Sequence, residues 1–154
     1  MIVGLEPSHR AGLLRLLKST VEFTPDEVDV ALELIDLGLG GSSDYRFCVH
    51  VDGAGEPDGY ICFGNTPMTS GTYDLYWIAV DASKKGSGIG RKLVAEAEGL
   101  MKAEGGRLVR VETSGNDAYD STRIFYDRLG YEIVARIRDF YDRGNDLVIY
   151  GHYF

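Results

Sequence analysis

The spacing of apolar residues along the chain alternates between a helical and a strand pattern. Leucines at positions 13, 14, 16 and 17 predict an amphipathic helix over Pro7–Lys18. The stretch TPDEVDVALELIDLGLGG predicts a second helix, in which Thr24 is the N-cap and Glu27 completes a capping box. The glycines from Gly38 onward are expected to end this helix.

Strands and two more helices are predicted over the rest of the chain. YRFCVHV and GYICFG, separated by turn residues, predict a hairpin, and TYDLYWIAV predicts a strand rich in aromatic and branched residues. A helix, a strand and another helix follow, and two strands around YDRGND close the chain. The order predicts an α/β fold of mixed α+β character, with a central mixed, mostly antiparallel sheet flanked by helices. The expected ranges of these later elements are Gly88–Ala103, Arg107–Thr113, a helix ending at Gly130, Tyr131–Phe140 and Asp146–Phe154.

Composition favours one compact soluble domain. The chain has 154 residues, of which 44% are hydrophobic, so it can bury a substantial core. The net charge of −8 argues against broad binding to nucleic acids or anionic membranes. No apolar run is long enough to span a bilayer and the N-terminus lacks a signal-peptide pattern, so we expect an unprocessed cytoplasmic protein.

Cysteine and histidine positions give no sign of a metal site or a disulfide. Cys48 and Cys62 lie inside apolar segments, which predicts buried reduced thiols and a reducing compartment. The histidines are scattered without metal-ligand spacing, so no metal is expected. They are His9, His50 and His152.

The segment KKGSGIGRKL places three glycines at alternate positions just before a predicted helix. A helix N-terminus carries backbone N–H groups without internal partners, and glycines there let an anion approach them. Four basic residues crowd this place in an acidic protein, which favours a phosphate ligand. The spacing fits neither a P-loop nor the dinucleotide fingerprint, although Glu112 lies at a suitable distance for a ribose contact. A simple tight turn is the other alternative. The basic residues are Lys84, Lys85, Arg91 and Lys92.

Two segments resemble the GNAT superfamily of acyl-CoA-dependent N-acetyltransferases. Lys85–Gly90 is similar to the (Arg/Gln)-x-x-Gly-x-(Gly/Ala) signature, with Lys85 in place of Arg or Gln. FYDRLGY, Phe125–Tyr131, is similar to the F-Y-x-x-x-G-F segment, and the element order of the whole chain is that of the family. The resemblance implies a single GNAT-like domain over residues 1–154 that moves an acetyl group from acetyl-CoA to a primary amine by direct attack in a ternary complex. The amine would belong to a small molecule or a peptide. A non-catalytic acyl-CoA-binding or regulatory module is the alternative.

The resemblance also assigns residues to acetyl-CoA, the implied co-substrate. The pantetheine arm would pair with the backbone at the end of the central strand, and the diphosphate with the amides of the glycine turn. Tyr119 stands where many relatives carry a cofactor-contacting Asn, so that contact is not expected here. The assigned residues are Ile78, Ala79, Val80, Lys85, Gly86, Ser87, Gly88, Ile89, Gly90 and Arg91.

Tyr126 and Asp74 are the candidates for proton transfer. Tyr126 matches the family tyrosine that donates a proton to the departing thiolate; alternatively it only packs beside Phe125. Asp74 is the one acidic residue on its face of a predicted strand, and its position matches a glutamate base in some relatives. A water chain could instead act as the base, with Asp74 at an exposed strand start and hydrogen-bonded to a nearby turn.

Other implied properties concern partners. Glu22 and Tyr141 lie where family members often line the acceptor pocket, with ordinary surface or packing roles as the alternative. A homodimer through the C-terminal strands is possible, and no nucleic-acid or membrane partner is expected. The identity of the amine is left open.

Overall fold

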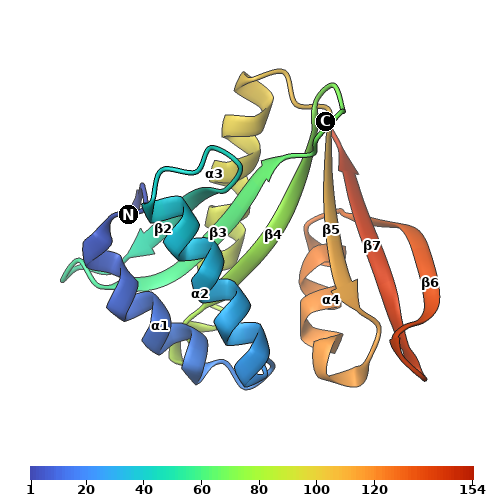
Figure 1. Ribbon diagram of the computed structural model, residues 1–154, viewed down its shortest axis with the longest axis horizontal. Coiled ribbons are helices and arrows are strands. Elements are labelled where there is room, and N and C mark those ends of the chain that lie inside the picture. The colour runs from blue at the N-terminus through green and yellow to red at the C-terminus, as the bar shows by residue number, and fades with distance from the viewer. The chain divides into compact units, whose positions relative to one another are not determined.

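The computed structural model describes residues 1–154, which form seven strands in one mixed sheet together with four α-helices (Figure 1). The sheet order is β1-β2-β3-β4-β5-β7-β6. This confirms the predicted fold class. The strands are β1 (Ile2–Val3), β2 (Arg46–Val51), β3 (Pro57–Asn65), β4 (Thr72–Val80), β5 (Leu108–Ser114), β6 (Glu132–Asp142) and β7 (Asn145–Tyr153). The α-helices are α1 (Arg10–Ser19), α2 (Pro25–Leu39), α3 (Ile89–Ala103) and α4 (Asp120–Arg128), with short 3-10 turns η1 (Pro7–His9), η2 (Ala82–Lys84) and η3 (Asp117–Tyr119).

The chain divides into two compact units. The first comprises Met1–Gly64 and Tyr76–Met101, and the second comprises Asn65–Leu75 and Lys102–Phe154. Strand β4 therefore contributes its first residues to the second unit and its last residues to the first.

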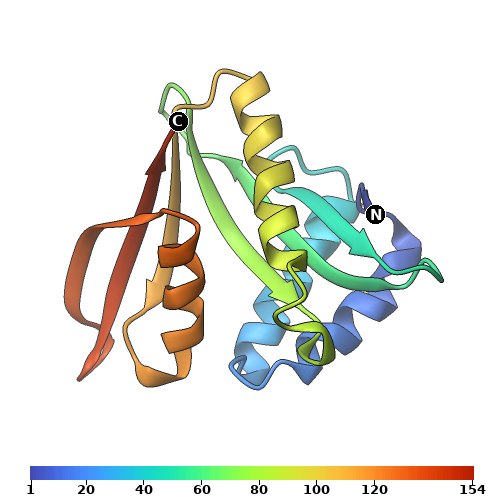
Figure 2. The same cartoon turned by 180° about the vertical axis from the view of Figure 1, so that it is seen from behind.

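In the first unit, helices cover both faces of the strands. Helices α1 and α2 lie on one face in Figure 1, and α3 lies on the other face, in front in Figure 2. Leucines of α1 and the buried residues of α2 pack on Val49, Tyr60 and Cys62 of the strands. On the α3 side, a Cβ added to Gly59 would stand 2.8 Å from Ile89 Cγ2, so glycine lets the helix approach β3 closely.

Helix α2 begins as predicted and ends later than expected. The Thr24 side chain accepts a hydrogen bond from the Glu27 amide, the N-cap interaction that the sequence indicates. The helix continues through Gly38 to Leu39, whereas we expected it to end at the glycines from Gly38 onward. A Cβ at Gly38 would stand 2.4 Å from the Phe47 ring, so this glycine serves close packing rather than termination.

The second unit contains a parallel ladder and an antiparallel hairpin. Thr72–Leu75 of β4 pair in parallel with Leu108–Val111 of β5, as the strand–helix–strand order predicts. Strand β7 pairs antiparallel with both β5 and β6, and so lies between them. Helix α4 packs against this part of the sheet (Figure 2). The position of β7 between β5 and β6 was not predicted, and neither was the short strand β1.

Candidate active site

The glycine turn follows β4 after the short turn η2 and leads into α3 within the first unit. Gly86 and Gly88 have φ angles of 81° and 87°, in the left-handed region that glycine adopts without penalty. Both are exposed, and apart from the adjacent residues of the chain no protein atom lies within 4 Å of a Cβ built at either position. The backbone conformation, and not crowding by the protein, thus requires glycine here, and the space in front of the turn is open.

Backbone donors at the start of α3 are available to a ligand. The first bond into the helix runs from the Lys92 amide to the Gly88 carbonyl, at 3.1 Å. The amides of Ile89, Gly90 and Arg91 precede it, and helix geometry gives them no intrahelical acceptor. Together with the partial positive charge of the helix N-terminus, these amides suit an anion such as a diphosphate.

Two of the four basic residues near the turn are already paired. The Lys84 ammonium lies 2.9 Å from Asp58 Oδ2 and 3.6 Å from Asp52 Oδ2. The Lys85 ammonium lies 2.9 Å from Glu22 Oε1, in the segment between α1 and α2. Arg91 and Lys92 are exposed. The turn is therefore less positive than its sequence suggests, and an anion at this place would depend more on the backbone amides than on these two lysines.

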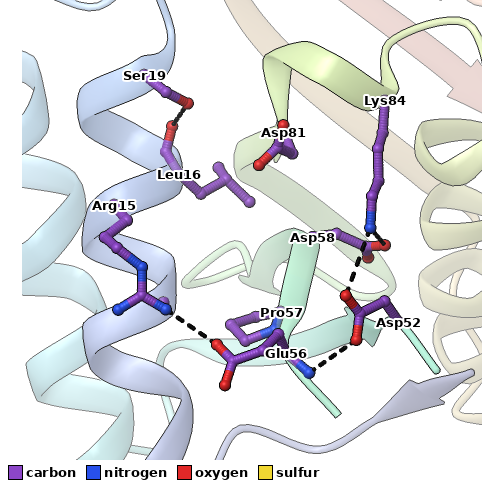
Figure 3. A pocket seen from close by; sticks show the side chains of 10 residues that line it. Arg15, Leu16, Ser19, Asp52, Glu56, Pro57, Asp58, Asp81 and Lys84 are labelled. Carbon is purple, nitrogen blue, oxygen red and sulfur yellow. Dashed lines mark hydrogen bonds and ion pairs between the residues drawn. The ribbon is translucent and has the colours of Figure 1, made fainter. Parts of the chain in front are cut away.

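Lys84 is anchored in a cavity beside η2. This cavity has a volume of about 370 Å³, and Figure 3 shows Lys84 pointing toward Asp58 and Asp52, with Asp81 above them. Buried Asp58 also forms a hydrogen bond with the His50 ring. The hydrogen bond that Asp58 accepts from Lys84 raises the pKa of Lys84 above the ordinary lysine value. Asp81 in turn accepts hydrogen bonds from the amide and hydroxyl of Ser83. These contacts fix η2, the segment from which the glycine turn begins.

The second unit contains Tyr126, in α4. Its side chain is only 2% exposed, and its ring contacts those of Phe125, Tyr131 and Tyr150. Burial raises its pKa well above the ordinary tyrosine value, so the hydroxyl stays protonated at neutral pH. Both the packing role and the proton-donor role are compatible with this environment.

Asp74 is held in an ion pair on β4 of the second unit. Arg110, its direct partner in the parallel ladder, donates to Asp74 Oδ1 at 2.7 Å, and Thr66 donates to Oδ2 at 2.9 Å. The side chain is buried, whereas the sequence alternative placed it at an exposed strand start. Each carboxylate oxygen thus already accepts one hydrogen bond.

The remaining candidate residues come from three other segments of the chain. Glu22 contacts the glycine turn through Lys85. Tyr141 is 49% exposed at the end of β6, and Tyr119 lies in η3. Cys48 and Cys62 are buried free thiols, as predicted, and burial raises the pKa of Cys48 to about 11. No helix has the length and apolar character needed to cross a bilayer.

Comparison with known proteins identifies the family. A model of the acetyltransferase (GNAT) domain matches residues 43–133, more than half of the chain. The chain belongs to the GNAT acetyltransferase family. The crystal structure of a GNAT-family protein from Desulfovibrio desulfuricans is 41% identical and superimposes with a TM-score of 0.94, covering 99% of this chain and 98% of the other. This confirms the family that the glycine turn and the FYDRLGY segment indicated.

Two further relatives bear on the chemistry of the GNAT family. Blasticidin-S acetyltransferase from Streptomyces morookaense is 40% identical over 68 residues, which are 44% of this chain and 46% of the relative. This chain thus matches about half the length of that curated relative. An aminoglycoside 6′-N-acetyltransferase complexed with coenzyme A shares the fold, with a TM-score of 0.78 at 19% identity over 99% of this chain and 96% of the other. The family match, the Desulfovibrio desulfuricans structure and the blasticidin-S acetyltransferase confirm the prediction of an acyltransferase, and the aminoglycoside acetyltransferase adds agreement of the fold.

Proposed function

We propose that this GNAT-family protein transfers an acetyl group from acetyl-CoA to a primary amine. The observation that carries the proposal is the exposed turn at Gly86 and Gly88, whose left-handed backbone opens directly onto the first amides of α3. The coenzyme A complex of an aminoglycoside acetyltransferase with the same fold supports the choice of anion. The acceptor would be a small-molecule amine, since the relatives include acetyltransferases named for blasticidin S and aminoglycosides.

The residues of the turn fit a diphosphate. Ten residues would bind the carrier: Ile78, Ala79 and Val80 through the strand backbone, and Lys85–Arg91 through the turn. When bound, acetyl-CoA supplies an acetyl thioester; attack by the amine forms a C–N bond, breaks the C–S bond and releases the thiol. The chain's own task is to orient the amine, accept its proton and protonate the sulfur.

We propose that Tyr126 donates the proton that the departing sulfur receives. The Tyr126 hydroxyl is protonated at neutral pH, as that of any tyrosine is, and a general acid must be protonated before it acts; burial raises the pKa further, so proton transfer depends on the hydroxyl being placed against the developing thiolate. Asp74 is the proposed base, with a water chain as the alternative. Arg110 and Thr66 each already donate a hydrogen bond to one of its carboxylate oxygens, so an amine would have to share these acceptors, and the water chain is kept as the alternative for that reason.

The decisive experiment is an amine panel with acetyl-CoA, followed by thiol release. The panel includes blasticidin S, an aminoglycoside and a basic peptide with a free N-terminus. We expect turnover with at least one amine and none with its N-acetylated form. Calorimetric binding of CoA without turnover on any amine would instead support the non-catalytic module, and no CoA binding by the folded chain would overturn both.

Asp74→Asn separates the two assignments of the base. The free energy of unfolding should fall by about 1–3 kcal/mol, because asparagine removes the negative charge and leaves one acceptor oxygen where Arg110 and Thr66 now have two. If Asp74 is the base, the variant also loses the acidic limb of the kcat/KM profile. A profile unchanged in shape would remove Asp74 from the mechanism and leave the water chain. Both are measured on the same preparation, by urea unfolding and by thiol release across pH.

Two finer properties stay predictions. Strand β6 lies at the edge of the sheet and exposes Ile133, Ile137 and Phe140, a surface that a second copy of the chain could cover. The buried free thiols agree with a reducing, cytoplasmic location.

A further inference from the structure

The ion pair between Lys85 and Glu22 joins two segments that lie 63 residues apart in the chain, both in the first unit. Lys85 belongs to the glycine turn, and its ammonium lies 2.9 Å from Glu22 Oε1. The Lys85 side chain is 48% exposed and that of Glu22 is 22% exposed. The pair is therefore partly open to solvent on the lysine side and more enclosed on the glutamate side.

Neighbouring residues hold Glu22 in place. Thr20 is buried and bonds the Leu16 carbonyl of α1, and the ring of Phe23 lies 5.2 Å from that of Trp77 on β4. Glu22 stands between these two anchors, so its carboxylate is positioned by the fold. Partial burial acts to raise the pKa of this carboxyl, but the hydrogen bond from Lys85, an interaction with the Glu22 backbone amide and the charge of Lys85 together outweigh it and keep the pKa below the ordinary glutamate value.

Each partner of the pair has binding capacity that the other does not use. Glu22 Oε2 is buried and has no hydrogen-bond partner, although a carboxylate oxygen accepts more than one bond. It can be satisfied only by a donor, such as an ammonium group. The Lys85 ammonium has three donor hydrogens and stands on the turn that would receive a diphosphate, which offers only acceptors.

We propose that the Lys85–Glu22 pair couples the two substrates. The proposal rests on the proposed function, whose two ligands have opposite charges. The diphosphate draws Lys85 away from Glu22, and the released carboxylate then binds the positively charged amine. The pair has to be separated only once, so whichever ligand binds first makes binding of the second more favourable.

The first test measures CoA affinity by calorimetry for the wild type, Glu22→Gln, Lys85→Met and the double variant. Glu22→Gln should bind CoA about two- to fivefold more tightly, the range expected for removing a partly exposed competing ion pair. In the Lys85→Met background the same change should have no effect. Pantetheine, which lacks the diphosphate, should bind the wild type and Glu22→Gln equally.

Glu33→Gln is the matched control, because Glu33 is an exposed carboxylate of α2 outside the proposed site. It removes the same charge and should leave CoA affinity unchanged. Equal CoA affinity of Glu22→Gln and Glu33→Gln, or a Glu22 effect that persists with Lys85→Met, would overturn the coupling. A wild type that binds no CoA would overturn the proposed function instead, so the two failures are distinguishable.

The second test uses the amine that turns over fastest in the panel. Glu22→Gln should raise the KM for this amine about two- to fivefold. In the wild type, saturating amine should tighten CoA binding by a similar factor, and this factor should fall to one in Glu22→Gln and in Lys85→Met. An unchanged KM for the amine in Glu22→Gln would overturn the assignment of Glu22 to the acceptor.

Discussion

Replacing Gly88 by valine should weaken CoA binding at least about 100-fold while the chain stays folded. Gly88 has a φ of 87°, which a β-branched residue avoids, so the turn is forced into another backbone path. The backbone amides that precede Lys92 then no longer point toward a common position where one diphosphate could bind them all. Losing two charge-assisted bonds at ~1.5–3 kcal/mol each accounts for an effect of this size. Calorimetry with CoA measures the affinity, and circular dichroism verifies the fold.

Gly144→Val is the control for backbone strain. Gly144 has a φ of 75°, lies in the turn between β6 and β7, and has no protein atom within 4 Å of a built Cβ. Both variants should lose about 1–3 kcal/mol of unfolding free energy, since both place a branched side chain in the left-handed region. Only Gly88→Val should lose CoA. Wild-type CoA affinity in a folded Gly88→Val variant would show that the turn does not bind the diphosphate.

Local patterns predicted most elements because their causes are local. The N-cap at Thr24, the alternation in TYDLYWIAV and the apolar stripe of α3 each depend on residues a few positions apart. The position of β7 between β5 and β6 was not predictable in this way. It depends on pairing between Val111 and Tyr150, distant in sequence, and strand alternation does not specify which strands are neighbours.

The same distinction applies to the candidate site. The sequence indicated a glycine turn before a helix, because three glycines alternate just ahead of a helical stripe, but it did not indicate that Gly86 and Gly88 take left-handed φ angles and Gly90 does not. It also grouped Lys84 and Lys85 as cations available to an anion, and here the interpretation was incomplete. Their partners Asp58 and Glu22 come from β3 and from the α1–α2 connection. A single sequence contains no signal for such distant pairs, and the same holds for the ion pair of Asp74 with Arg110.

Removing the hydroxyl oxygen of Tyr126 should lower the turnover number strongly. With Tyr126→Phe we expect kcat to fall by about 10²–10⁴-fold, the usual contribution of a general acid, with little change in the KM for acetyl-CoA. The ring is retained, so its packing with Tyr131 and Tyr150 persists. Thiol release with the best amine of the panel measures kcat, and thermal unfolding verifies the fold.

Tyr60→Phe is the matched control for this change. Tyr60 is fully buried in β3 of the first unit, and its hydroxyl has no hydrogen-bond partner, so its removal should leave kcat unchanged and stability equal or higher. The pH dependence gives a second readout. Burial places the pKa of folded Tyr126 above its ordinary value of 10.0, so the neutral ring stabilises the fold fully below that pH, and this stability is lost as pH rises through the higher folded pKa. Wild-type stability should therefore fall more steeply above about pH 10 than that of Tyr126→Phe. If kcat of Tyr126→Phe equalled that of Tyr60→Phe while this alkaline difference was observed, Tyr126 would be a packing residue and the proton would reach the thiolate by another route.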